Sequence, residues 1–129
     1  MQNRRTLFLA VAGLVAASTF VAPAFVTSAW AHAFLDHATP GVGSTVQGSP
    51  AQLSLSFTQN IVASFSGVSV TSAEGAAVPT GKAVVDPSDP ATLHVSIGKL
   101  KPGTYVVNWH VVSVDTHHTS GAYKFTVSP

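Results

Sequence analysis

Two residues near the end of the chain form a short motif that could bind a metal ion. Asp115 and His117 are separated by one residue and follow a long apolar-polar alternation. In extended chain a D-x-H spacing points both side chains to the same face, so one carboxylate oxygen and one imidazole nitrogen would face the same ion. The alternative is a hydrogen-bonded loop pair, or a turn in which Asp115 bonds a backbone amide.

A third candidate ligand, His32, depends on processing of the N-terminus. Two arginines at positions 4 and 5 precede an uncharged stretch, 6–31, which ends in Ala-Trp-Ala. This order of charged, apolar and small residues is typical of a secretory signal peptide, although the stretch is also long enough for a retained membrane helix. Cleavage after Ala31 would divide the chain into a signal peptide, 1–31, and an exported or periplasmic domain, 32–129. The arginine pair resembles a twin-arginine signal only weakly, so the export route stays open.

Processing at that site would give His32 two metal-binding nitrogens, the α-amine and imidazole Nδ1. With Asp115 and His117 they would form a set of four nitrogen and oxygen donors. Such a set favours one Cu(II) ion by ligand type and by the Irving–Williams order, whereas Zn(II) would prefer a tetrahedron. An amine with a pKa of about 7.7 and an imidazole near about 6.5 must lose protons to bind, so affinity should fall below neutral pH.

Composition excludes several other kinds of site. The chain has no cysteine, and its single methionine is Met1, so thiolate and thioether ligands are absent from the predicted exported domain. That domain, 32–129, contains no arginine, and its four lysines against five acidic residues give a net charge of −1 with neutral histidines. We therefore expect a soluble domain without the basic surface that nucleic-acid binding requires.

The elements that must position these residues are short strands. Segments 52–57, 68–71 and 93–97 alternate apolar and polar residues, and 104–114 is the longest such segment. Turn residues separate them at 40–44, 86–90 and 101–103, and no segment has sustained helical periodicity. The pattern predicts an all-β, Ig-like Greek-key sandwich or barrel. In the long strand, we expect Tyr105, Val107, Trp109 and Val111 to face the core.

Several blocks of the sequence resemble the CopC family of periplasmic copper-resistance proteins over nearly all of 32–129. These blocks are His32; Ala38, Thr39 and Pro40 with Gly43 and Ser44; Leu55, Ser56 and Phe57; Phe65, Ser66 and Gly67; Leu100, Lys101, Pro102, Gly103, Thr104 and Tyr105; Trp109; Ser113, Val114, Asp115, Thr116 and His117; Gly121; and Phe125, Thr126 and Val127. The resemblance implies a cupredoxin-like Greek-key barrel that binds and carries Cu(II).

By position, the resemblance implies His32, Asp115 and His117 as the ligands and a CopD-like inner-membrane copper transporter as a partner. The sequence departs from some relatives at two points. Gln59 stands where they have a glutamate near the metal, so an additional ligand there is in doubt. The methionine-rich loop that some relatives use for Cu(I) is missing, which indicates a member that binds Cu(II) only.

Three classes of function follow from these residues. We expect a non-enzymatic protein that buffers or carries copper, and the sequence does not distinguish import, detoxification and delivery. The alternatives are a histidine-brace mono-oxygenase-like enzyme and a metal-free Ig-like structural module. Of the other histidines, His118 is expected to be exposed or to lie behind the ligands, and His37 to be a surface residue, although contact of either with the metal stays open. His94 and His110 are expected to be surface or hydrogen-bonded residues.

Overall fold

The computed structural model describes residues 13, 16–19 and 33–129. His32 and most of the predicted signal peptide, 1–31, lie outside the described residues. Within the described residues, no helix combines the length and the apolar character needed to span a membrane.

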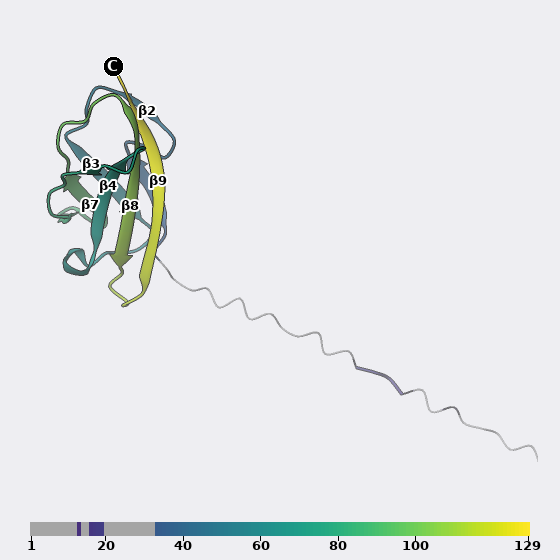
Figure 1. The fold of residues 1–129 in the computed structure, drawn as a ribbon. Helices are drawn as coiled ribbons and strands as arrows, with labels where there is room; N and C mark the ends of the chain where they lie inside the picture. Colours follow the sequence, from purple (N-terminus) through teal and green to yellow (C-terminus); the bar gives the residue numbers. More distant parts are fainter. Residues whose placement is uncertain (1–12, 14–15, 20–32) are drawn as a thin grey trace, which may run out of the picture.

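The described residues form nine strands and one short 3-10 helix, η1 (Ala63–Phe65), which confirms the all-β prediction. The strands make two sheets, visible in Figure 1 as the two layers of a sandwich. Their bounds are β1 (Leu35–Thr39), β2 (Thr45–Gln47), β3 (Gln52–Phe57), β4 (Gly67–Ser72), β5 (Ala77–Val78), β6 (Val84–Asp86), β7 (Asp89–Ser96), β8 (Gly103–Val112) and β9 (His118–Ser128).

The chain passes repeatedly between the two sheets, as in a Greek-key sandwich. The four-stranded sheet has the order β1-β3-β7-β6 and the five-stranded sheet the order β2-β9-β8-β4-β5. The described strand pairs are antiparallel except for β2, which runs parallel to β9. The β8–β9 pair is the most extensive, since its register continues from Gly103 opposite Val127 to Val112 opposite His118.

The core lies between the sheets and is built from alternate residues of each strand. Tyr105, Val107, Trp109 and Val111 are all buried, so the predicted core face of the long strand is confirmed. The Trp109 ring meets Phe57 of the other sheet edge to face, with ring centroids 5.1 Å apart and an interplanar angle of 70°. This contact joins the two sheets at the end of the sandwich where β3 and β8 finish.

Gly121 gives the Trp109 ring its space. The two residues are directly opposite on β9 and β8. A Cβ atom at position 121 would lie 2.6 Å from Cζ2 of the indole, which is closer than atoms can approach. A side chain here would displace the ring from the core, and glycine is therefore the residue that the close approach requires.

Candidate metal centre

Asp115 and His117 lie in the loop 113–117, which connects β8 to β9. The amide of Thr116 donates to the carbonyl of Ser113 at 2.9 Å, and the amide of Ser113 donates to the carbonyl of His117 at 3.0 Å. Thr116 has a φ of 70°, in the left-handed region. The strand predicted to reach residue 114 therefore ends at Val112, and the expected extended geometry of the D-x-H motif is wrong.

The turn nevertheless brings the two side chains together. Oδ2 of Asp115 lies 3.0 Å from Nδ1 of His117, and each side chain is 39% exposed. The reversal of the backbone at Thr116, and not strand alternation, brings the Asp115 carboxylate next to the His117 ring. A carboxylate on Nδ1 orients the ring and leaves Nε2 as the other possible ligand atom.

Ser113 holds the Asp115 carboxylate by a side-chain hydrogen bond. Its side chain is fully buried, and its hydroxyl donates a short hydrogen bond to Oδ1 of Asp115. The same hydroxyl lies 3.4 Å from the carbonyl of His117. Hydrogen bonding by Ser113, and then by His117, lowers the pKa of Asp115 below its ordinary value. The carboxyl group is therefore held in its charged, metal-binding form.

Sequence reasoning missed this role, because Ser113 was included only as part of the family resemblance. The signal was local: a serine two residues before an aspartate, at the first position of a turn, is well placed for a side-chain hydrogen bond across that turn.

The first described residues of the domain run beside this loop. The hydroxyl of Thr119 donates to the carbonyl of Ala33 at 2.7 Å. Phe34 exchanges two hydrogen bonds with Thr58, at 3.0 Å to its hydroxyl and at 2.9 Å from its amide. Ala33 is fully buried. The chain thus enters the sandwich between the end of β3 and the start of β9, two residues along from His117.

The segment that contains Gln59 also borders the loop. The amide of Val114 donates to the carbonyl of Asn60 at 3.0 Å, and Ile61 forms a β-bridge with Ser113. Gln59 precedes these residues and is half-buried. Its amide is neutral, so it brings no second negative charge to this end of the molecule.

Two other histidines have carboxylate partners of their own. The imidazole of His37 lies 3.0 Å from Asp36, with both side chains exposed. His94 lies 2.7 Å from Asp86 through Nε2 and 2.9 Å from the hydroxyl of Ser54 through Nδ1. Hydrogen bonds from His94 and then Ser88 hold the pKa of Asp86 well below its usual range. The expectation that His94 is a satisfied residue is confirmed.

The described residues contain no group of three or more histidine, cysteine, aspartate or glutamate side chains that could hold a metal ion. Asp115 and His117 alone supply one oxygen and one nitrogen donor. Both fit a borderline divalent ion, which is usually bound by at least one further protein ligand. The third predicted ligand, His32, lies outside the described residues.

Comparisons with known proteins give the same family as the sequence blocks. Residues 35–128 match the CopC domain. Protein YobA of Escherichia coli (strain K12) is 41% identical over 101 residues, covering 78% of this chain and 82% of its own length. Copper resistance protein C of Xanthomonas campestris pv. juglandis is 36% identical over 128 residues, covering 95% and 92%.

A solved structure agrees with these relatives. The crystal structure of CopC from Methylosinus trichosporium OB3b superposes with a TM-score of 0.72 at 33% identity, covering 76% of this chain and 95% of that one. The predicted β-sandwich and the predicted family are both confirmed by this likeness. The chain belongs to the CopC domain family.

Proposed function

We propose that this protein is an exported, non-enzymatic carrier that binds one Cu(II) ion through His32, Asp115 and His117. The observation that carries the proposal is the position of the first described residues. Ala33, which follows His32 in the sequence, is bonded to Thr119, and Thr119 is two residues from His117. The membership of the CopC family and the names of relatives such as copper resistance protein C support copper as the metal.

Each proposed ligand has its own means of placement. The buried Ser113 and the turn at Thr116 hold Asp115 beside His117. The hydrogen bond between Ala33 and Thr119 anchors the chain next to that loop. A free amine and an imidazole at position 32 would then meet a carboxylate and a second imidazole. This donor set would leave the ion with one net positive charge.

The oxidation state follows from the donor types. Cu(I) prefers soft sulfur ligands, and the chain has no cysteine and no methionine after Met1. Imidazole, amine and carboxylate donors in a tetragonal arrangement suit Cu(II). One complete set of four donors supports one tightly bound ion.

The carrier role rests on the proposed export and on membership of the CopC family. A signal peptide, 1–31, would send the domain to the periplasm, where it could buffer copper or pass it to a CopD-like inner-membrane transporter. As a ligand beside His117, the Asp115 carboxylate would fill a coordination position that an oxygen-activating copper enzyme keeps open. Sustained oxygen consumption by the copper form with ascorbate would favour the oxygenase alternative.

Competitive titration with Cu(II) tests the ligand set. The Asp115→Ala and His117→Ala variants should each lose affinity by orders of magnitude, with unchanged far-UV circular dichroism. The matched control is His37→Ala, which removes an exposed histidine with its own carboxylate partner and should leave affinity unchanged. Normal affinity in either ligand variant would remove that residue from the site.

The N-terminal chelate needs a separate test. Adding one residue before His32 would turn its α-amine into an amide and should weaken Cu(II) binding as strongly as His32→Ala. N-terminal sequencing of the exported protein would show whether processing leaves His32 first. An extended protein that bound Cu(II) normally would refute the chelate.

A further inference from the structure

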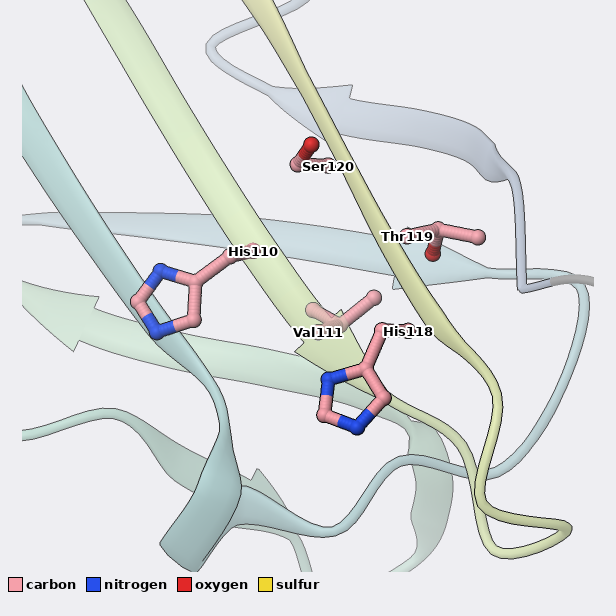
Figure 2. Close-up of a pocket in the computed structure, with 5 residues that line it drawn as sticks. All are labelled: His110, Val111, His118, Thr119 and Ser120. Atoms are coloured by element: carbon pink, nitrogen blue, oxygen red, sulfur yellow. The ribbon is translucent and has the colours of Figure 1, made fainter.

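Two histidines outside the proposed site lie close together on the outer face of the five-stranded sheet. His110 is opposite Ser120 in the β8–β9 pair, and His118 is opposite Val112. The two histidines are therefore diagonal neighbours on adjacent strands, a relation within reach of long and aromatic side chains. Figure 2 shows both imidazole rings projecting from the same side of the sheet.

These two imidazoles differ from the other histidines of the described chain. His37, His94 and His117 each lie within 3.0 Å of a carboxylate oxygen. The imidazoles of His110 and His118 have neither a hydrogen bond nor an ion pair with any described residue, and both residues are exposed. Their ring nitrogens are therefore available to an external ligand.

The ring of His110 lies over the backbone of β4 at Gly67. Gly67 is directly opposite His110 in the β4–β8 pair. A Cβ atom at position 67 would lie 2.4 Å from Cε1 and 2.9 Å from Nε2 of the imidazole. The ring therefore lies across the strand at a point that only glycine leaves free.

The surface between the two histidines is hollowed. A shallow cavity of about 220 Å³ is lined by His110, Val111, His118, Thr119 and Ser120. Each water occupies about 30 Å³ in the liquid, so the hollow has room for an ion and several coordinating waters. The hydroxyl of Thr119 is already bonded to Ala33. The two imidazoles are the side chains of this lining that carry nitrogen.

We propose that His110 and His118 form a second metal site, which binds a borderline divalent transition-metal ion, Cu(II) most strongly, through two imidazoles and water. Neutral imidazole is the side-chain ligand that copper, nickel and zinc share, and Cu(II) has the highest affinity of this series. The site has no carboxylate and no chelating amine. It therefore binds more weakly than the proposed His32, Asp115 and His117 site and fills after it.

Titration of the exported protein with Cu(II) tests the second site. Native mass spectrometry should show a second copper adduct at excess metal, and electron paramagnetic resonance should show two imidazole nitrogens on that second ion. The His110→Gln and His118→Gln variants should each weaken the second equivalent by about 100-fold, because two ligands that engage one ion together can gain that factor over one. His37→Gln is the matched control and should keep both equivalents.

A double variant, Asp115→Ala with His117→Ala, separates this inference from the proposed function. It should lose the tight equivalent and keep the weak one. A second equivalent that survives in His110→Gln or His118→Gln would overturn the proposal, as would the absence of any second equivalent in the unmodified protein. Failure of the tight site alone would contradict the proposed function and leave the His110 and His118 site standing.

Discussion

Ser113→Ala is the substitution that most directly tests how the loop prepares its ligands. The change removes one hydroxyl from a fully buried side chain and leaves its volume nearly unchanged. Asp115 then loses the donor that contributes most to lowering its pKa. We expect weaker Cu(II) binding and a rise in the pKa of Asp115 toward the ordinary value.

The expected loss of Cu(II) affinity in Ser113→Ala depends on how well water can replace the Ser113 hydroxyl as a hydrogen-bond donor to Asp115. Loss of a group that orients a metal ligand typically reduces affinity by about 10- to 100-fold. The Asp115 side chain is 39% exposed, so water can bond the carboxylate in the variant. We therefore expect the lower end of that range, about tenfold, which corresponds to about 1.4 kcal/mol of binding free energy.

The assay is a competitive Cu(II) titration together with an NMR titration of the Asp115 carboxyl carbon. Ser56→Ala is the matched control, because it also removes a buried hydroxyl, which lies 2.7 Å from that of Thr92 in the four-stranded sheet. Each substitution should lower the free energy of unfolding by about 1 kcal/mol, the net value of one hydrogen bond. Equal copper affinities in the two variants, with the pKa of Asp115 unmoved, would refute the positioning role.

Three further outcomes are expected. Two hydrogen-bond donors lower the pKa of Asp115, so its carboxylate stays charged at pH 5. The Cu(II) affinities of the unmodified protein and of Asp115→Asn should therefore fall in parallel between pH 7 and 5. Affinities that converge in competitive titrations would show instead that the carboxyl group titrates in that range. Gly67→Ala should displace the His110 ring and weaken only the second Cu(II) equivalent, with the tight one unchanged in the same mass spectra. The buried hydroxyl of Tyr123 has no hydrogen-bond partner among the described residues, and burial raises its pKa to about 12; Tyr123→Phe should therefore keep or raise the midpoint of urea unfolding, since it removes an unsatisfied polar group.

Most of the fold could be predicted from the sequence because strand alternation is a local signal. Segment 52–57 and the core face of Tyr105, Val107, Trp109 and Val111 are as predicted. The strand predicted to end at Val114 ends two residues earlier, at Val112. The prediction was too long because Ser113 and Val114 continue the alternation of polar and apolar residues into a turn. A positive φ at Thr116 leaves no clear mark in the sequence, because threonine is unusual in that conformation.

The candidate site was predictable in its residue types but not in its geometry. Asp115 and His117 were identified from spacing, and the loop brings them together by a different route. Nothing local to the sequence reveals that Ala33 bonds Thr119, because the two residues are 86 positions apart and meet only through the sandwich. The same is true of His110 and His118, whose proximity depends on the β8–β9 register.

The β8–β9 hairpin explains how a small domain without disulfides could hold such a site. Its register is continuous over ten residue pairs from Gly103 to Val112, so both ends of the loop 113–117 are fixed by the longest ladder in the fold. Ser113 ties the loop to the buried side of that ladder before any metal binds. Asp115 and His117 therefore form a preorganised half of the proposed site. The other half depends on the short segment before β1, whose first described residue, Ala33, accepts a hydrogen bond from Thr119. Because the buried core is shared by both sheets and contains neither Asp115 nor His117, metal removal should leave the sandwich intact. Copper affinity within this arrangement should then depend both on the loop 113–117 and on how firmly the segment before β1 is anchored.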